Sequence, residues 1–298
     1  MTVPLDSACP EPNWAGLTLE VTGDGSTTFF SKEFGEWFHC RSGAYSDAQK
    51  NYVEAARVAA LAQAEQLTLL DVCYGLGYNT AAALETIFQI NPHCRVTLRA
   101  LEINQVVPQA AIAHGLLDRW SPPVQDILTC LVDGTPYRRN GLDLQLLFGD
   151  ARQTIQPLAT RSWQADAILF DPFSPTRCPQ LWTVEFFERV SRCLSDQGVL
   201  ATYSCAAAVR AAMQLAGLYI RSIPGVGRTW PCTIATKQPI SANLSQQEQE
   251  HLRTRAAIPY RDPTLTATAE AIRHRRQQEQ QQSSLEATGA WRRRWLGR

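Results

Sequence analysis

Polar or glycine-containing segments follow several apolar runs of the sequence, and together they could hold a small ligand and react with it. Each run reads as an uninterrupted buried strand, which is typical of a parallel sheet covered on both faces. Ligands of such sheets bind beyond the carboxyl ends of the strands, so we expect these ends to meet along one edge. They carry Gly75 and Gly77, Glu102, Asp150, Asp171 and Ser204.

The segment 69–80, Leu-Leu-Asp-Val-Cys-Tyr-Gly-Leu-Gly-Tyr-Asn-Thr, predicts the cofactor-binding turn of a Rossmann-like fold. Gly75 and Gly77 allow a tight backbone turn and a close approach to a ligand, and the helix that follows presents its positive dipole end. A dinucleotide-binding turn would carry a third small residue where Thr80 stands, so the pyrophosphate-binding pattern is incomplete. Within this turn, the predicted cofactor-binding residues are Asp71, Gly75, Gly77 and Asn79.

The second and third strand ends indicate which cofactor is bound. Glu102 can accept hydrogen bonds from both ribose hydroxyls, which would serve NAD and S-adenosylmethionine alike. Asp150 can contact an adenine amino group and the backbone N–H of Ala151 can contact the ring, which favours an adenosyl group. Each acid could instead cap a helix or face solvent. Together with the glycine turn, they predict S-adenosylmethionine as the cofactor.

The segment 171–175, Asp-Pro-Phe-Ser-Pro, follows the fourth strand and predicts the reaction site. Class I methyltransferases that act on nitrogen often carry Asp or Asn here, followed by Pro and an aromatic residue. Methyl transfer needs an amine with a free lone pair, and the Asp171 carboxylate can hydrogen-bond the amine or take its proton. Neighbouring carbonyls and an aromatic face can orient the nucleophile. We therefore predict Asp171 as the catalytic residue, with a turn-capping role as the alternative.

Several sequence blocks also resemble one enzyme family. Over about residues 17–237 the chain is similar to the methyltransferase half of the bifunctional enzyme that completes 5-methylaminomethyl-2-thiouridine at the tRNA wobble position. The blocks are Gly23-Asp24-Gly25-Ser26, Phe34-Gly35-Glu36 with His39, Gly43-Ala44, Gly75-Leu76-Gly77, the 171–175 segment with Pro179-x-Leu181-Trp182, and Pro224-Gly225-Val226-Gly227-Arg228.

The resemblance implies methylation of the uridine's aminomethyl group, with tRNA as the partner. It also implies a stand-alone enzyme, because nothing after residue 240 resembles the FAD-dependent domain of the bifunctional form. It assigns Asp171 to the amine, and the aromatic residues below to the walls around the uracil, although core packing is an equally open role for them. The bifunctional members usually have Gly where this chain has Pro172. The implied substrate contacts are Phe173, Ser174, Pro175, Trp182, Tyr203 and Arg228.

The pattern of elements predicts an α/β fold of the class I Rossmann-like methyltransferase type. Strands are expected at 67–73, 95–101, 143–148, 166–170 and 198–204, alternating with helices and closed by an antiparallel pair at 218–223 and 231–236. A hairpin, a strand at 36–40 and a helix over 47–64 precede them. The expected divisions are a loose N-terminus (1–15), a hairpin and helix region (16–64), the S-adenosylmethionine-binding domain (65–240) and an Arg/Gln-rich helical extension (241–298).

Composition constrains the environment. Hydrophobic residues make up 45% of the 298, enough for a sizeable core, and the formal net charge is zero. The nine cysteines are odd in number and contain no Cys-x-x-Cys pair, which argues against a disulfide framework and against a metal site. No signal peptide and no apolar run of about 20 residues are evident. We expect a cytoplasmic protein without a metal.

The C-terminal extension is locally basic. Residues 253–298 hold ten arginines against four acidic residues, and such asymmetry can mark an arm that touches nucleic acid. The segment 291–295, Trp-Arg-Arg-Arg-Trp, combines aromatic and cationic groups that suit stacking on RNA. A solvated polar tail, or a helix packed on the catalytic domain, remains the alternative.

Two other functions stay open at this point. An aminopropyltransferase would share the Rossmann sheet, the N-terminal hairpin and an acid at the amine site. It would normally add several acids to hold a polyamine, and here only Asp171 and Asp150 qualify. A non-catalytic cofactor-binding module would be expected to have lost Glu102 or Asp171, and both are present.

Overall fold

The main body of the molecule is an eight-stranded sheet of order β10-β11-β9-β8-β4-β5-β7-β6. The computed structural model describes residues 14, 16–160 and 163–297, so most of the predicted loose N-terminus lies outside the described part. Strands β7, β5, β4, β8 and β9 run parallel, and β6, β10 and β11 run antiparallel to their neighbours. The strands are β4 (Gln66–Val72), β5 (Arg95–Glu102), β6 (Tyr137–Arg139), β7 (Leu142–Phe148), β8 (Ala165–Phe170), β9 (Leu194–Thr202), β10 (Tyr219–Ile223) and β11 (Cys232–Thr236).

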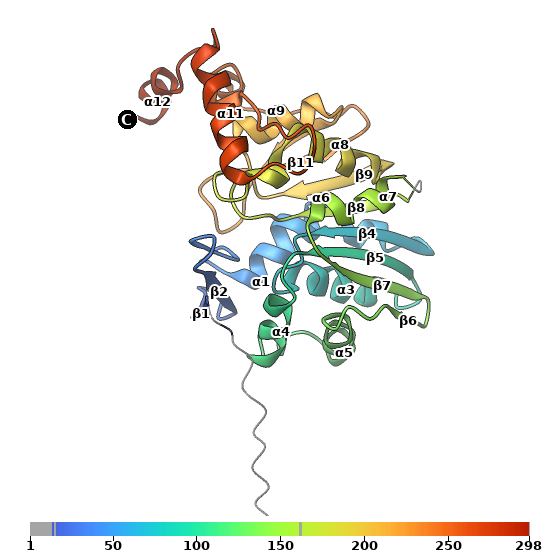
Figure 1. Ribbon diagram of the computed structural model, residues 1–298. Helices are drawn as coiled ribbons and strands as arrows, with labels where there is room; N and C mark the ends of the chain where they lie inside the picture. The colour runs from blue at the N-terminus through green and yellow to red at the C-terminus, as the bar shows by residue number, and fades with distance from the viewer. Residues whose placement is uncertain (1–13, 15, 161–162, 298) are drawn as a thin grey trace, which may run out of the picture.

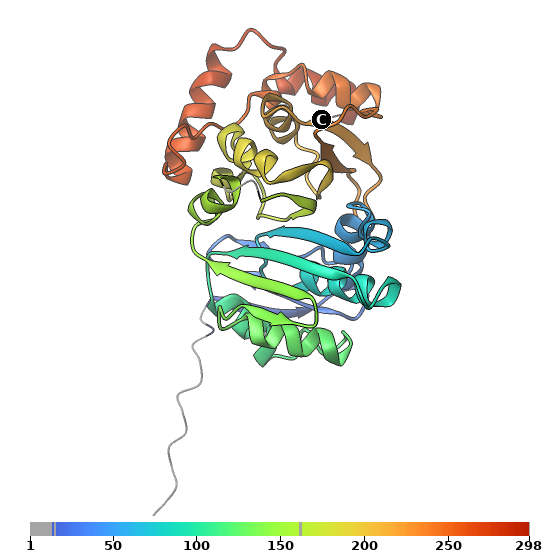
Figure 2. The same ribbon diagram turned by 90° about the vertical axis from the view of Figure 1, so that its right-hand side faces the viewer.

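Helices cover both faces of this sheet (Figures 1 and 2). Successive side chains of β4 point to opposite faces of the sheet. They therefore pack into two different hydrophobic cores, one on each face. Leu69 packs with α3 (Tyr78–Ile90), α4 (Val106–Ala113) and α5 (Pro122–Leu131). Leu70 packs on the other face with α6 (Ala151–Thr154), α8 (Val184–Arg192) and α9 (Ala207–Leu215). The two buried faces confirm the Rossmann-like α/β class. Two short helices, α7 (Gln156–Thr160) and the 3-10 helix η2 (Pro179–Trp182), complete the connections.

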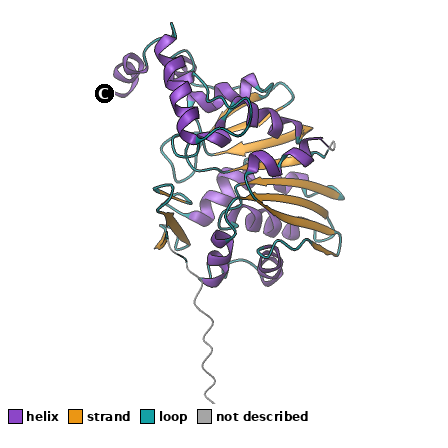
Figure 3. Cartoon of the chain, in the orientation of Figure 1, coloured by secondary structure: helices purple, strands orange, loops and turns teal. Residues whose placement is uncertain are grey.

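A three-stranded antiparallel sheet, separate from the main sheet in Figure 3, precedes it in the chain. The predicted turn at 23–26 joins its first two strands, and the Asp24 carboxylate ties that turn to the next helix by accepting hydrogen bonds from the Ser46 backbone N–H (2.9 Å) and hydroxyl (2.8 Å). A Cβ on Gly43 would lie 2.4 Å from an Asp24 oxygen, so the glycine leaves room for the carboxylate. The strands are β1 (Leu17–Val21), β2 (Thr27–Ser31) and β3 (Glu36–Trp37), the last shorter than the predicted 36–40 strand.

The helix predicted over 47–64 is not regular. It is divided into α1 (Ala44–Asp47), a π-helical segment η1 (Ala48–Glu54) and α2 (Val58–Leu61). Arg57 adopts a left-handed φ of 60° and separates the last two. π-helical turns occur often at functional sites, and η1 carries two side chains of the site described below.

The C-terminal extension packs against the β9–β11 part of the molecule (Figures 1 and 2). Ser245 caps α10 and forms a capping box with Glu248. Trp291 is buried, and its indole N–H donates to the Gln247 carbonyl (3.0 Å). The elements are α10 (Gln246–His251), the 3-10 helix η3 (Arg255–Ala257), α11 (Ala269–Gln282) and α12 (Thr288–Leu296).

Strand β6 and helix α5 are absent from the sequence-based expectations. Pro122 and Pro123 stand in the first turn of α5, where proline is well tolerated. None of the helices in the described ranges combines the length and apolar character needed to cross a lipid bilayer.

Candidate active site

A cavity of about 610 Å³ lies at the carboxyl edge of the parallel strands. Its lining includes Gly75 after β4, Glu102 at the end of β5, Asp150 after β7 and Asp171 after β8. The convergence predicted from the strand ends is therefore confirmed for these four residues. Ser204 differs, because it lines a second cavity instead.

The glycine turn and the second strand end are joined by hydrogen bonds. The backbone N–H groups of Gly75 and Asn104 donate to the two different oxygens of the Glu102 carboxylate, both at 2.8 Å. Burial raises the pKa of Glu102. Each oxygen keeps a further lone pair, and the carboxylate lines the cavity. This donor-and-acceptor set fits the ribose hydroxyls of an adenosyl cofactor.

Two other residues predicted to bind the cofactor brace the turn from behind. Asp71 is fully buried and accepts a hydrogen bond from the Thr80 hydroxyl (2.6 Å), and burial raises its pKa to about 7. Gly77 begins α3 with φ of 86°, and a Cβ there would lie 2.6 Å from the Tyr74 phenol oxygen. Neither Asp71 nor Gly77 lines the cavity. Thr80, where a dinucleotide site has a small residue, is used here to hold Asp71.

The third strand end carries an ion pair. Arg152 donates to both oxygens of Asp150, with the shortest contact from Nη2 to Oδ2 at 2.6 Å. Asp150 also caps α6 by accepting the Arg152 backbone N–H (2.9 Å). Asp150, Ala151 and Arg152 all line the cavity. The capping role of Asp150 is thus confirmed, and its role in cofactor binding stays a prediction.

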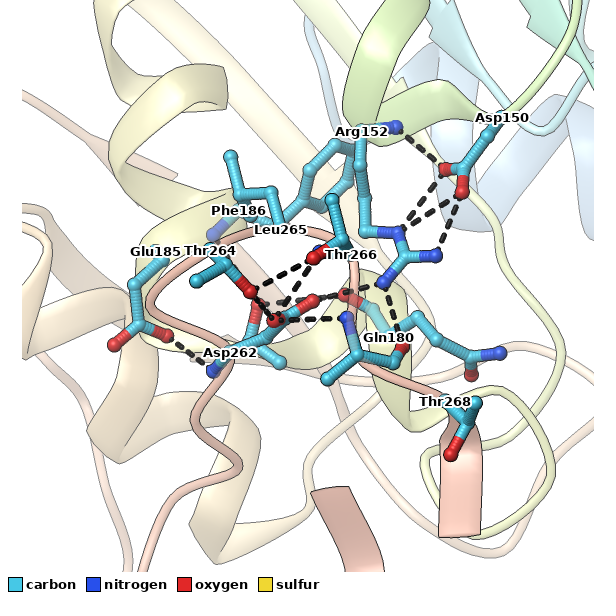
Figure 4. A network of polar contacts seen from close by, with 12 residues as sticks. Asp150, Arg152, Gln180, Glu185, Phe186, Asp262, Thr264, Leu265, Thr266 and Thr268 are labelled. Atoms are coloured by element: carbon cyan, nitrogen blue, oxygen red, sulfur yellow. Dashed lines mark hydrogen bonds and ion pairs between the residues drawn. The ribbon is translucent and has the colours of Figure 1, made fainter. Parts of the chain in front are cut away.

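Arg152 connects this cavity to the C-terminal extension (Figure 4). Its Nη1 donates to Asp262 Oδ2 (2.8 Å) and to the Ala267 carbonyl (2.9 Å). Asp262 is completely buried, and its backbone N–H donates to Glu185 at the start of α8 (2.8 Å). The extension thus holds the arginine that orients Asp150, a contact across 110 residues that local sequence patterns do not reveal.

The Asp171 carboxylate is held by two donors. The Tyr52 phenol from η1 donates to Oδ1, and the Asn79 side-chain amide from α3 donates to Oδ2 (3.0 Å). Burial, reinforced by the negative charge of Asp47, raises the pKa of Asp171 well above its usual range. Asn79 was predicted to bind the cofactor, but it contacts Asp171 and does not line the cavity.

Side chains in and beside β3 of the N-terminal sheet cover the 171–175 loop. Phe173 stacks on Phe34 with ring centroids 4.3 Å apart and meets Phe38 edge-on at 4.9 Å. Ser174 donates its backbone N–H to Glu36 (2.9 Å) and its hydroxyl to the same carboxylate. Phe173 and Ser174 line the cavity, and their role as substrate contacts stays a prediction.

The remaining predicted substrate residues separate into two groups. Tyr203 and Arg228 line the cavity, and the Arg228 guanidinium lies 4.5 Å from the centre of the Tyr203 ring. Pro175 and Trp182 do not line it. Trp182 is fully buried in the core, where its indole N–H donates to the Phe173 carbonyl (2.8 Å) and supports the loop from below.

The 224–228 loop is tied to the N-terminal region. The Asn51 side chain accepts from the Val226 N–H (2.9 Å) and donates to the Val226 carbonyl (3.0 Å). The Ser42 hydroxyl donates to the Gly227 carbonyl (2.9 Å). Sequence patterns missed Asn51 and Tyr52 as site residues, since both fall in a segment whose small and apolar residues indicate a packed helix.

The segment 291–295 is largely occupied by contacts within the chain. Arg294 forms ion pairs with Glu250 (2.8 Å) and Glu286 (3.0 Å). Trp295 donates its indole N–H to Glu250 (2.7 Å). Arg292 and Arg293 are exposed. These contacts lie within the extension. The extension is joined to the catalytic domain by the ion pairs Arg152–Asp262 (2.8 Å), Arg210–Glu248 (2.6 Å) and Glu185–Arg261 (2.7 Å), so its described residues pack on that domain, and contact with RNA stays a prediction.

Comparisons with known proteins indicate the type of enzyme. Residues 94–238 match a family described as S-adenosyl-L-methionine-dependent methyltransferase. The chain is 28% identical over 257 residues to an uncharacterized protein of Methanocaldococcus jannaschii, covering 85% of this chain and 70% of that protein. It is 26% identical over 240 residues to the tRNA 5-methylaminomethyl-2-thiouridine biosynthesis bifunctional protein MnmC of Burkholderia vietnamiensis, covering 74% of this chain and 35% of that protein. The chain therefore spans about a third of the length of the MnmC relatives.

A solved structure resembles the whole fold. The crystal structure of MnmC2 from Aquifex aeolicus superposes with a TM-score of 0.78 at 28% identity, covering 91% of this chain and 87% of that one. Together with the adenosyl-type donor set at Glu102 and Asp150, these findings assign the cofactor. The chain is an S-adenosyl-L-methionine-dependent methyltransferase that is similar in sequence and structure to proteins named MnmC.

Proposed function

We propose that the chain methylates the nitrogen of the 5-aminomethyl group of uridine or 2-thiouridine at the tRNA wobble position. The observation that carries this proposal is the Asp171 carboxylate, fixed by Tyr52 and Asn79 at the wall of the cofactor cavity. The printed names of the MnmC relatives supply the substrate class. We also place the reaction in the cytoplasm, where such tRNA would be met.

The bound cofactor would supply an activated methyl group, and the protein must supply a neutral amine in line with it. A primary amine is largely protonated at neutral pH, so a nearby base is useful. Asp171 has one remaining lone-pair direction on each oxygen, because Tyr52 and Asn79 already donate one hydrogen bond to each. Its raised pKa makes it a better proton acceptor than an ordinary aspartate.

Aromatic side chains would receive the uracil. Phe173 and Tyr203 both line the cavity, and the Tyr203 phenol donates to the carbonyl of Pro172, the residue before Phe173 (3.0 Å). Both rings are therefore fixed relative to Asp171. Arg228, above the Tyr203 ring, would provide positive charge for the RNA backbone.

The test uses purified protein, S-adenosylmethionine with a labelled methyl group and tRNA that carries the unmethylated aminomethyl nucleoside. Mass spectrometry of the digested tRNA should show the methyl group on that nucleoside. Calorimetry with S-adenosylhomocysteine would establish that the protein is folded and binds the cofactor product. If the cofactor product binds and the nucleoside gains no methyl group, the proposed substrate is wrong.

A further inference from the structure

We propose that a second cavity, beside the first, holds the nucleotide next to the target uridine in the RNA chain. This inference rests on the proposed function. The second cavity has a volume of about 500 Å³ and shares Tyr203 and Arg228 with the first. Its other walls come from the 229–231 segment, the 204–206 segment after β9, and the helices α9, α10 and α12. Two adjacent cavities that share two lining residues suit two successive nucleotides of one strand.

Arg228 marks the boundary between the two cavities. Its guanidinium lies 4.5 Å from the centre of the Tyr203 ring, and the loop that carries it is anchored to Asn51 and Ser42. It forms no salt bridge with any residue in the described ranges. A fixed guanidinium without a direct ion pair, placed between two nucleotide-sized spaces, suits the phosphate that joins the nucleotides.

Trp230 supplies a surface on which a base can stack. It lines the second cavity and is 50% exposed, which is unusual for a residue of this size. A Cβ on Gly225 would lie 2.5 Å from the Trp230 carbonyl oxygen, so the glycine allows the loop to fold back and carry the indole. Stacking on an aromatic ring does not depend on base identity. The cavity can therefore accept different neighbouring bases.

The charged side chains that line the second cavity leave it with net positive charge, as binding of RNA phosphates requires. Arg210 is buried and neutralised by Glu248 at 2.6 Å, so this pair is structural. Burial lowers the pKa of His251, which stays neutral while it stacks on Trp291 with ring centroids 4.0 Å apart. Arg292 on α12 is exposed and lines the cavity. The available charges are thus those of Arg228 and Arg292, which suit the phosphates on the two sides of one nucleotide.

This arrangement gives the C-terminal extension a defined part in RNA binding. Helices α10 and α12 form a wall of the second cavity rather than a loose basic arm. The extension would then act on the nucleotide beside the target, close to the reaction site.

The experiment combines protein variants with altered RNA. Trp230→Ala and Arg292→Gln remove the stacking surface and the cavity charge. Tyr219→Ala is the matched aromatic control, since Tyr219 is 47% exposed on β10 and lines neither cavity. Arg293→Gln is the matched charge control on the same helix. The RNA is an anticodon stem-loop with the aminomethyl nucleoside, either intact or with an abasic site immediately 5′ or immediately 3′ of the target.

We expect Trp230→Ala to weaken binding of the intact stem-loop roughly ten-fold, because one stacked base contributes on that scale. One of the two abasic sites should cause a similar loss in the unmodified protein and no further loss in Trp230→Ala. Arg292→Gln should weaken binding and reduce its salt dependence, and both control variants should leave affinity unchanged. Affinity for S-adenosylhomocysteine should be the same in all variants.

If the losses from Trp230→Ala and from each abasic site simply multiply, the indole stacks on neither neighbour and the proposal is wrong. If Arg292→Gln and Arg293→Gln change RNA affinity by the same amount, Arg292 has no specific role in the cavity and the proposal is also wrong. Because affinity is measured without turnover, these outcomes do not depend on methylation. Absence of methyl transfer to the intact stem-loop by the unmodified protein would count against the proposed function alone.

Discussion

The phenol of Tyr52 donates a hydrogen bond to the carboxylate of Asp171, although the two residues are 119 positions apart in the chain. Tyr52 lies on the π-helical segment before the main sheet, and Asp171 follows β8. Burial and the nearby Asp171 charge raise the pKa of Tyr52 well above its usual range, so the phenol keeps its proton and remains a donor. The N-terminal region thus takes part in orienting the predicted catalytic group.

Replacement of Asp171 by Asn should separate binding from turnover. The amide retains the size of the side chain but cannot accept a proton, so kcat should fall by about 100-fold or more, in the range of general base catalysis. Affinity for S-adenosylhomocysteine should stay within about two-fold, because Glu102 and Asp150 are untouched. Single-turnover kinetics and calorimetry would measure the two quantities. Unchanged kcat would exclude Asp171 as the base.

The dependence of kcat on pH should follow the ionisation of the Asp171 carboxyl group. Activity requires the ionised carboxylate, so it should be present above the raised pKa and lost as the pH falls through it, at a midpoint above the ordinary value of about 3.9. The hydrogen bond from Tyr52 lowers this pKa. Tyr52→Phe should therefore move the acidic limb to higher pH and reduce kcat. A limb that stays in place in Tyr52→Phe would arise from another group, such as the substrate amine.

Substitution of Asp262 by Asn should weaken both the fold and the cofactor site. It leaves Arg152 without its buried partner, and breaking such a pair costs about 3 kcal/mol of unfolding free energy. Asp150 then loses its fixed orientation, so affinity for S-adenosylhomocysteine should fall several-fold. Asp196→Asn is the control, because Asp196 is 76% exposed and 3.9 Å from Lys237. Denaturant unfolding should show less than about 0.5 kcal/mol for the control.

The pair of Arg210 and Glu248 should make stability depend on acidity. Burial opposes ionisation, but hydrogen bonds from Ser222 and Arg210 outweigh it and lower the pKa of Glu248 from 4.5 to about 2. The stabilisation is therefore complete above pH 4.5 and lost as the pH falls towards 2. Melting temperature measured across this window should fall less steeply in Glu248→Gln. The same slope in both proteins would show that other carboxylates dominate.

Much of the fold and part of the site could be predicted from sequence. Apolar runs with polar ends identified the strands, and the position of ligands at the carboxyl edge of parallel sheets then brought Glu102, Asp150 and Asp171 together. The pattern could not identify Arg152, because its buried partner Asp262 lies in the extension. Trp182 was predicted to contact the substrate, but it is buried in the core. An aromatic residue near a reaction loop can line a cavity or support it from the core, and only packing distinguishes the two.

The two hydrogen bonds between Asn51 and Val226 address the main chain of the loop and leave the valine side chain unused. The Asn51 carboxamide therefore constrains the length of the loop but not the type of side chain at position 226. Over evolutionary time, the side chain at 226 should be free to vary, whereas an insertion or deletion between 224 and 228 would displace Arg228 and should be rare. Related sequences should therefore differ in this loop by substitutions and almost never by gaps.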